Sequence, residues 1–402
     1  MQIIYIDREG ERCELCLETL MEGATLPAKR AATFEAMDKP ELFALLHKAV
    51  EAGVAPVLFD PKMELIAERV KGFGVTPYTE SQEACTLPGE SYAVFFTSGT
   101  TGVPTGAVKS RENIELEVAA HKALFGSQGY ERIIVTVPFI HIYGFLAGVM
   151  LPRALGCEVL FKEEYWPQEL LELHEGKKTL VVTSPVYMKS LLKLRRANAI
   201  PNVHFLSSTG LLLEEEVAAF EEKYETRVWQ LFGSTETGGV AIKQGVTPWW
   251  TPLSGVKVSR NAEEVMVVDS PYLSPYTIEE ELRVLENPFT MTDIIEMEGE
   301  RFRLLGRLSE LVKVSGKRFS LSELEHLIET KLSAKEALIR LERDSSRLKD
   351  EGLRIEIAGG GGISEAEVSA LLHEHYPQVN FRFSLHHVDA VEKNSMGKKV
   401  RR

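Results

Sequence analysis

Apolar positions along the chain alternate between helical and strand-like spacing. In KPELFALLHKAVEAG (39–53) they recur every three or four residues up to Gly53, which predicts a helix. VAPVLFD (54–60) follows as a short apolar run, typical of a buried strand. The same order returns in the predicted helix MELIAERVKGFG (63–74) and the predicted strand SYAVFFTSG (91–99). This succession indicates helix and strand layers with mostly parallel strands.

The alternation continues through the first three quarters of the chain. RIIVTVPF (132–139) and KTLVVTSP (178–185) are short β-rich runs bounded by proline and glycine. EEEVAAFEEKY (214–224) is an amphipathic helix, and the strand RVWQLFG (227–233) follows it. We therefore predict an α/β fold, with a large N-terminal domain of layered α/β subdomains.

The pattern changes near residue 290, where a smaller α+β unit is expected. The predicted boundary is close to Gly306 and divides the chain into 1–305 and 306–402. Ser320 or Ser322 is a candidate cap for one helix, and Ser364 opens a second. The predicted elements are a hairpin over 301–320, a helix over 321–333, a strand over 352–362, a helix over 364–376 and a strand over 379–388.

Composition and charge exclude several classes of protein. The 402 residues are 44% hydrophobic with a formal net charge of -13, so the overall field disfavours nucleic acid and anionic membranes as partners. No apolar run approaches the roughly 18 residues of a membrane span. The charged start MQIIYIDREGERCELC lacks the apolar region of a secretion signal. The four cysteines include one C-x-x-C without a second ligand pair, which favours free thiols and a cytoplasmic location.

The stretch FFTSGTTGVPTGAVKS (95–110) concentrates small and hydroxylated residues. Glycines at 99, 102 and 106 permit positive φ and a close approach of backbone to a ligand. Free N–H groups and hydroxyls in such a loop form a concave anion site suited to a polyphosphate. The stretch does not match G-x-x-x-x-G-K-[ST], and by itself it is equally compatible with an ordinary turn.

Six segments in order nevertheless resemble those of the adenylate-forming superfamily, which includes acyl-CoA synthetases, adenylation domains and luciferases. The loop is similar to its [ST]-S-G-T-T-G-x-P-K-G pattern, and the whole set resembles acyl- and aryl-CoA synthetases of the 4-coumarate-CoA-ligase type. The six segments are TSGTTGVPTG (97–106), PFIHIYG (138–144), FGSTETGG (232–239), MTD (291–293), GRLSELVKVSGKRFSLSELE (306–325) and NSMGKKVRR (394–402).

The resemblance implies ATP and Mg²⁺ as cofactors. Phe232 is expected to stack on adenine, Thr235 to contact the α-phosphate, and Glu236 to hold Mg²⁺ through a hard carboxylate oxygen. Asp293 and Arg307 are expected at the ribose. Lys398 is expected to cover the reacting carboxylate and α-phosphate, where negative charge gathers. The expected phosphate-binding residues are Thr97, Ser98, Gly99, Thr100, Thr101 and Gly102.

The resemblance also places an acyl pocket, whose substrate is a small-molecule carboxylic acid. His141 is expected to gate this pocket or pack beside the substrate carboxylate, and Tyr143 to pack on an aromatic ring or in the core. FIHIYG and LSSTGLL lack the aspartate that holds an amino-acid ammonium group, which leaves aryl and medium-chain acyl acids. The remaining expected pocket residues are Ser208, Thr209, Gly210, Gly238 and Gly239.

A second half-reaction is implied, in which a thiol attacks the acyl-AMP. The C-terminal domain is expected to rotate about Ser309, so that the loop around Gly316 replaces Lys398 and lines the thiol tunnel. The thiol belongs to coenzyme A or to the phosphopantetheine of an acyl carrier protein, and the sequence leaves both open.

The chain departs from the family pattern in two places. Thr105 stands where the family has the loop lysine, and Lys109 is expected to lie on a strand leaving the loop. A non-catalytic nucleotide-binding scaffold is therefore the rival from another class. The segment before Thr97 is also shorter than in relatives, so part of the first subdomain is expected to be missing, with a homodimer contact as one way to cover that face.

Overall fold

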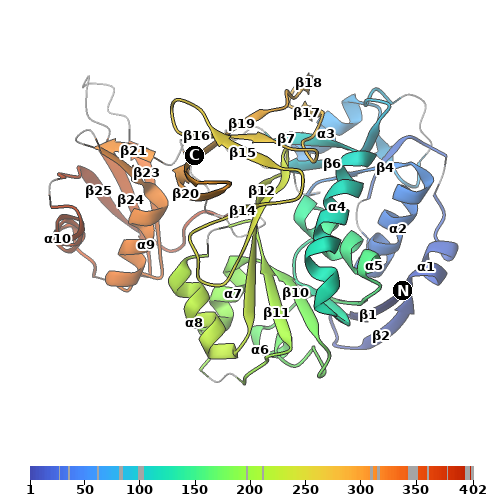
Figure 1. The fold of residues 1–402 in the computed structure, drawn as a ribbon, viewed down its shortest axis with the longest axis horizontal. Helices are drawn as coiled ribbons and strands as arrows, with labels where there is room; N and C mark the ends of the chain where they lie inside the picture. Colours follow the sequence, from blue (N-terminus) through green and yellow to red (C-terminus); the bar gives the residue numbers. More distant parts are fainter. Residues whose placement is uncertain are drawn as a thin grey trace.

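We describe the chain from a computed structural model, which shows two large sheets, a smaller antiparallel sheet and a C-terminal α+β unit (Figure 1). The described residues are 1–26, 28–34, 37–60, 63–80, 85–97, 104–195, 198–210, 212–307, 311–314, 317–342, 352–359, 362–377, 379–393 and 399.

The central sheet has nine strands among the described residues, in the order β14-β13-β12-β11-β10-β8-β9-β1-β2. Strands β12, β11, β10, β8, β9 and β1 run parallel, and the edge strands β13, β14 and β2 are antiparallel. The strands are β1 (Gln2–Ile6), β2 (Arg12–Cys16), β8 (Arg132–Val135), β9 (Glu158–Lys162), β10 (Thr179–Thr183), β11 (Val203–Ser207), β12 (Arg227–Ser234), β13 (Gly238–Gln244) and β14 (Thr251–Pro252).

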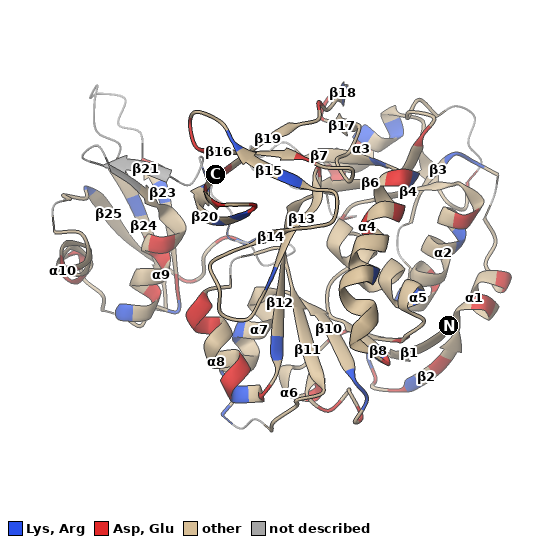
Figure 2. Ribbon diagram, in the orientation of Figure 1, with Lys and Arg blue, Asp and Glu red and all other residues tan. Residues whose placement is uncertain are grey.

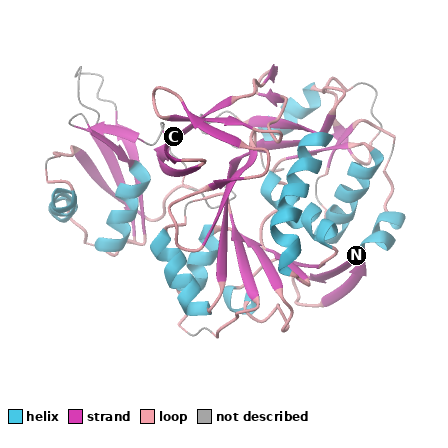
Figure 3. Cartoon of the chain, viewed as in Figure 1, coloured by secondary structure: helices cyan, strands magenta, loops and turns pink. Residues whose placement is uncertain are grey.

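Helices cover both faces of this sheet (Figure 3). On β8, Ile134 packs in a cluster with residues of α6, α7 and α8, whereas Ile133 and Val135 pack in the cluster that includes α2, α4 and the π-helix η2. Burial on both faces explains the continuous apolar runs of the parallel strands. The helices of these two layers are α2 (Lys39–Ala52), α4 (Arg111–Phe125), η2 (Gly144–Met150), α5 (Leu151–Leu155), α6 (Pro167–Leu170), α7 (Pro185–Leu192) and α8 (Glu214–Tyr224).

A second sheet of seven described strands carries the expected phosphate loop. Its order is β18-β17-β7-β6-β4-β3-β5, parallel from β5 to β6 and antiparallel from β6 to β18. The elements of this region are α1 (Leu17–Gly23), β3 (Ala31–Thr33), β4 (Ala55–Leu58), α3 (Glu64–Gly72), β5 (Thr76–Pro77), β6 (Ser91–Thr97), β7 (Thr105–Ser110), the 3₁₀ turn η1 (Gly126–Gln128), β17 (Tyr276–Ile278) and β18 (Leu282–Val284).

The alternation of helix and strand ends earlier than the predicted residue 290. In the described part of the chain no helix lies between Tyr224 and Leu321, and a four-stranded antiparallel sheet of order β15-β16-β19-β20 fills much of this stretch. Exposed and buried residues alternate only irregularly along its strands, so the pattern of apolar positions did not predict them. They are β15 (Lys257–Arg260), β16 (Val265–Asp269), β19 (Phe289–Glu298) and β20 (Arg301–Arg307).

The C-terminal elements lie at one end of the molecule in Figure 1 and have an apolar core of their own, formed by residues between Phe319 and Phe381. The hairpin predicted over 301–320 covers only residues 311–314 and 317–320, because residues 301–307 pair with β19 in the preceding sheet. As predicted, Ser320 caps a helix through the Glu323 N–H, and Ser364 opens the second helix with a capping box. The elements are β21 (Leu311–Val314), β22 (Lys317–Ser320), α9 (Leu321–Lys331), β23 (Glu336–Glu342), β24 (Gly352–Ala358), α10 (Glu365–His375) and β25 (Phe383–Val388).

The C-terminal unit touches the rest of the chain through α8, a helix that is acidic along much of its length (Figure 2). His326 Nε2 on α9 lies 2.7 Å from Glu215 Oε1 on α8, and the Glu215 side chain is 70% exposed. Exposed pairs of this kind contribute little binding energy. Among the described residues, no helix is long and apolar enough to cross a membrane, and all four cysteines are free thiols.

Candidate active site

The expected phosphate loop connects β6 and β7. Thr97 ends β6 opposite Thr105, which begins β7, so the two strands form a hairpin whose turn is the expected loop. Five of its predicted residues, Ser98, Gly99, Thr100, Thr101 and Gly102, lie outside the described residues. At its foot Arg69 of α3 donates from Nη1 to the Pro104 carbonyl oxygen, 2.5 Å away. A guanidinium therefore lies beside the position where the family pattern has its lysine.

Gly106 plays a different part from the one we predicted. It lies within β7 rather than in the turn, and it pairs with Phe96 across the hairpin. A Cβ atom there would lie 2.8 Å from the Phe96 ring. Glycine at 106 is thus required by strand packing, and the prediction of a ligand-approaching turn was wrong for this position.

The segment FGSTETGG forms a tight turn between β12 and β13. Ser234 and Thr237 close it by two hydrogen bonds, from Ser234 N–H to Thr237 Oγ1 (3.0 Å) and from Thr237 N–H to Ser234 Oγ (3.1 Å). A Cβ at Gly233 would lie 2.1 Å from the Gly238 carbonyl oxygen, so the two strands approach each other too closely here for a side chain at this position. Thr235 and Glu236 lie at the tip of this turn and are half-buried, which leaves the Glu236 carboxylate access to a ligand.

Phe232 lies at the end of β12 within an aromatic group. Its ring centroid is 5.7 Å from that of Trp250 and 6.0 Å from that of Phe302. Phe302 and Trp250 are buried, whereas Phe232 keeps part of its surface accessible. The two buried rings hold Phe232 as a flat, partly open apolar surface, which suits stacking on a purine. Sequence reasoning did not find Trp250 or Phe302.

Asp293 and Arg307 are brought together although they are fourteen positions apart. They face each other in the register of β19 and β20, and Arg307 Nε lies 3.2 Å from Asp293 Oδ1. Asp293 is 4% exposed, and a buried carboxylate needs such a partner. The carboxylate can accept hydrogen bonds and the guanidinium can donate them, so the two hydroxyl groups of a ribose would suit this pair.

The remaining expected residues gather at the carboxyl edge of the parallel strands. His141 follows β8, and Ser208 follows β11 and donates from Oγ to the Leu231 carbonyl of β12 (2.8 Å). Thr209 has φ of 76°, an uncommon conformation for a β-branched residue. Gly210 is exposed, and a Cβ there would meet Pro185 only at ordinary van der Waals distance, 3.5 Å. Ligands of open α/β sheets bind at this edge. The uncommon backbone conformation of Thr209 there suggests that this residue has a functional role.

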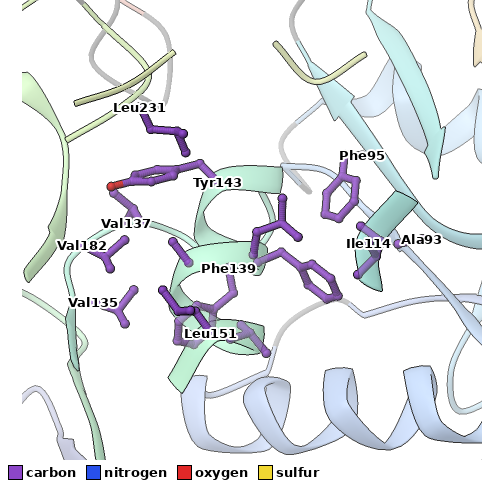
Figure 4. Packing of buried hydrophobic residues seen from close by; sticks show 14 of the residues in the cluster. Ala93, Phe95, Ile114, Val135, Val137, Phe139, Tyr143, Leu151, Val182 and Leu231 are labelled. Atoms are coloured by element: carbon purple, nitrogen blue, oxygen red, sulfur yellow. The ribbon is translucent and has the colours of Figure 1, made fainter. Parts of the chain in front are cut away.

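Tyr143 lies in the core, which was one of its two predicted positions. Its ring is 6% exposed and packs among buried side chains between η2 and β12, with its hydroxyl directed away from Phe139 (Figure 4). That hydroxyl donates to the Leu206 carbonyl oxygen at 2.6 Å, and burial raises the pKa of Tyr143 far above 10. The side chain therefore ties the start of η2 to β11.

Gly238 and Gly239 are buried and face the interior. A Cβ at Gly238 would lie 2.4 Å from Glu117 Oε2, and one at Gly239 would lie 2.8 Å from Leu253 Cδ1. Gly238 also has φ of 70°. In this structure both glycines are required by packing against Glu117 and Leu253, and their expected part in an acyl pocket stays a prediction.

Three expected residues of the C-terminal unit, Ser309, Gly316 and Lys398, lie outside the described residues. Two charged residues that the prediction gave no role, Lys109 and Glu117, are buried behind the Glu236 turn. Lys109 does lie on a strand that leaves the loop, β7, as predicted. In the described part of the chain no group of three or more His, Cys, Asp or Glu is arranged to hold a metal ion by itself.

Comparison with known proteins identifies the family. The family described as AMP-binding enzyme matches residues 15–279. The chain therefore belongs to the AMP-binding enzyme family, and similar proteins include several that are named CoA ligases. It is 30% identical over 161 residues to a probable CoA ligase of Humulus lupulus, covering 38% of this chain and 29% of that protein. It is 29% identical over 158 residues to a 4-coumarate–CoA ligase of Halorhodospira halophila, covering 39% and 37%. The chain thus matches well under half the length of either relative.

The fold match extends further than the sequence match. The o-succinylbenzoate CoA synthetase of Bacillus subtilis, in complex with its acyl-adenylate intermediate, superposes with a TM-score of 0.82 at 15% identity, covering 99% of this chain and 94% of that one. At this identity the similarity shows the fold alone. It confirms the predicted α/β architecture with its C-terminal α+β unit.

Proposed function

We propose that the protein activates a carboxylic acid with ATP and transfers the acyl group to the thiol of coenzyme A. In the first step a carboxylate oxygen of the acid bonds to the α-phosphorus, and the bond from that phosphorus to the bridging oxygen breaks, releasing pyrophosphate. In the second step the thiolate sulfur attacks the acyl carbon and AMP leaves. Family membership and the CoA ligases among the relatives support this proposal.

The single observation that carries the proposal is the candidate ligand set: Phe232 and Glu236 border the β12–β13 turn, and the sheet that holds the Asp293–Arg307 pair also supplies Phe302 to the ring group of Phe232. An aromatic face, a half-buried carboxylate and a buried acceptor–donor pair fit an adenine, a hard cation and a ribose. Mg²⁺ on Glu236 would neutralise phosphate charge as pyrophosphate leaves. In this proposal Thr235, one residue before Glu236, contacts the α-phosphate, and His141 borders the acid.

The domain division proposed is 1–305 and 306–402, with the smaller domain mobile about Ser309. The separate apolar core of residues 319–381 supports this division, since such a unit keeps its own packing when it moves. Lys398 then acts in adenylation and the Gly316 loop in thiol transfer, as the family resemblance implies.

For the substrate we propose an aryl or medium-chain acyl acid. The absence of aspartate from the 139–144 and 206–212 segments disfavours an amino acid. The relatives include a medium-chain fatty-acid–CoA ligase of Escherichia coli, 26% identical over 156 residues. Transfer to an acyl carrier protein, a homodimer and a cytoplasmic location stay predictions.

A non-catalytic nucleotide-binding scaffold is the second candidate, favoured by Thr105 in place of the loop lysine. Against it, Arg69 brings a cation to the same loop. Carboxylate-dependent ATP–pyrophosphate exchange with a panel of aryl and acyl acids, without thiol, separates the two. Exchange with one acid supports the ligase and identifies its substrate; ATP binding without exchange supports the scaffold. Adding coenzyme A or a carrier protein then identifies the acceptor.

A further inference from the structure

Two charged residues next to the site are fully buried and have no part in the proposed chemistry. Lys109, on β7, is 0% exposed, and Glu117, on α4, is 1% exposed. Lysine and glutamate are almost never buried to this degree unless they are paired. Both belong to the stretch that directly follows the phosphate loop, and both point to the turn that carries Glu236.

Lys109 fixes the backbone of Glu236. Its Nζ donates to the Glu236 carbonyl oxygen at 2.9 Å and to the Tyr272 carbonyl oxygen at 2.7 Å. The same Glu236 oxygen accepts from the Ser274 N–H at 2.8 Å. The carbonyl is therefore held from two sides, and an ammonium donor makes the stronger of these bonds.

Glu117 fixes the other end of the same turn. Its Oε1 accepts from the Gly239 N–H at 2.6 Å. A Cβ at Gly238 would lie 2.4 Å from Oε2 and one at Gly239 would lie 3.0 Å from Oε1, so the carboxylate is packed directly on the backbone. The helix that carries Glu117 is itself anchored nearby, because Asn113 Nδ2 donates to the Pro271 carbonyl at 2.7 Å.

The two opposite charges stabilise each other's ionised form at fully buried positions. Burial lowers the pKa of Lys109 and raises that of Glu117, while each charge favours the ionised form of the other. The Glu236 carboxylate likewise favours the charged form of Lys109. Between them the two side chains hold the run 236–239 at both ends.

We propose that Lys109 and Glu117 are positioning residues, which hold the backbone of Glu236 so that its carboxylate points to the Mg²⁺ of the bound nucleotide. This inference rests on the proposed function, through the metal-binding role of Glu236. Mg²⁺ demands near-ideal octahedral geometry, so a small change in the direction of one carboxylate weakens the site. Neither positioning residue needs to touch the nucleotide for this effect.

The alternative is that the two buried charges contribute only to packing. Replacing two opposite buried charges together by neutral side chains of similar volume is often neutral for stability, so stability alone does not distinguish the two roles. The distinguishing quantity is the factor by which Mg²⁺ tightens the binding of a non-hydrolysable ATP analogue.

The test uses the double variant Lys109→Met/Glu117→Gln of the full chain, which keeps side-chain volume and leaves no unpaired charge. The matched control is Arg132→Met/Glu158→Gln, which neutralises another buried pair at the opposite, amino-terminal edge of the central sheet. Glu236→Gln serves as the reference for loss of the metal ligand. Calorimetry measures analogue affinity with Mg²⁺ and with EDTA, and thermal melting checks the fold.

We expect the double variant to bind the analogue in EDTA as the wild type does and to lose about tenfold or more of the Mg²⁺ enhancement, as Glu236→Gln does. The control keeps the full enhancement. In pyrophosphate exchange, kcat falls while the KM for the acid is unchanged. An unaltered Mg²⁺ enhancement in a folded double variant overturns the proposal, and so does an equal loss in the control.

If the double variant does not fold, Lys109→Arg takes its place, because it keeps the charge but displaces the donor atoms. If this variant melts at the same temperature as the wild type but shows a weaker Mg²⁺ enhancement, the result supports the proposal. An unchanged Mg²⁺ enhancement overturns it. A wild-type protein that binds Mg²⁺ and the analogue but exchanges no pyrophosphate contradicts the proposed function alone. A wild type without any Mg²⁺ enhancement overturns the inference.

Discussion

Asp293 and Arg307 lie opposite each other on β19 and β20, with Arg307 Nε 3.2 Å from Asp293 Oδ1. Because the pair is set by the register of two long strands, its geometry is fixed before any ligand binds. The buried Asp293 carboxylate keeps a partner in the free protein, and it retains lone pairs that can accept from hydroxyl groups.

Asp293→Asn is expected to weaken ATP binding, because an amide replaces a charged acceptor at the ribose. The loss of a charge-assisted bond corresponds to about ten- to hundredfold in the KM for ATP. Steady-state exchange with ATP and with its 2′- and 3′-deoxy analogues measures this effect. The wild type discriminates against the deoxy analogues and the variant does not; equal discrimination in both would place the ribose elsewhere.

Tyr143→Phe is expected to destabilise the protein without altering acid preference. The variant leaves the Leu206 carbonyl without its donor, at a cost of about 1–3 kcal/mol in the free energy of unfolding. Urea denaturation gives that free energy, and exchange with the acid panel gives the preference. A changed order of acids at unchanged stability would show that the ring lines the pocket after all.

Arg69→Gln is expected to raise the KM for ATP about tenfold, since it removes the cation at the foot of the phosphate loop. Thr105→Lys in the same variant is expected to restore the affinity by returning the lysine of the family pattern. Lys71→Gln, on the same helix and exposed, is the matched control for a lost charge. If Thr105→Lys improves the wild type but does not rescue Arg69→Gln, the two cations do not share a role.

His121 is expected to make the protein less stable as the pH falls from 6.5 to about 4. Burial lowers its pKa from 6.5 to about 4, and its ring nitrogens have no hydrogen-bond partner among the described residues. Below pH 6.5 His121 binds a proton in the unfolded chain but stays neutral in the folded chain until about pH 4. The free energy of unfolding therefore decreases on acidification, by up to about 3 kcal/mol.

His121→Leu is the variant that checks this pH dependence. Unfolding free energies at pH 7, 6 and 5 should fall less steeply in the variant, with stability at pH 7 kept or raised. His47 and His204 have pKa values lowered in the same direction by burial, so the slope decreases without vanishing. An identical slope would contradict a neutral, buried His121.

Lys398→Ala and Gly316→Leu test the two half-reactions. Lys398→Ala is expected to abolish pyrophosphate exchange and spare transfer from preformed acyl-AMP, whereas Gly316→Leu shows the reverse bias. Single-turnover assays of each half-reaction measure the split. If both variants lose both steps equally, the two-conformation mechanism does not apply to this protein.

The sequence predicted the fold well where one periodicity dominates a segment. The helix before Gly53 and the apolar strands of the central sheet are correct because burial on one or both faces leaves a clear pattern. The antiparallel sheet of residues 257–307 was not found, because its half-exposed strands carry no regular alternation of buried and exposed residues.

Site residues were predictable when they belong to a contiguous motif, as Phe232 and Glu236 do. Trp250 and Phe302 were missed because only the fold brings them to Phe232. Glu117 left a readable signal: it stands with Ile114 and His121 on the buried face of α4, where a charge is unexpected. Gly106 was misjudged because a glycine in a turn and one opposite an aromatic ring look alike in sequence.

The strand β7 and the first two turns of α4 carry residues 105–117 from the phosphate loop straight to the turn of Glu236. A chimera that exchanges the loop alone would therefore separate it from the side chains that hold the turn of Glu236. Recombination with a relative should place its breakpoints before β6 and after Glu117, so that this stretch is inherited as a single block together with residues 234–239.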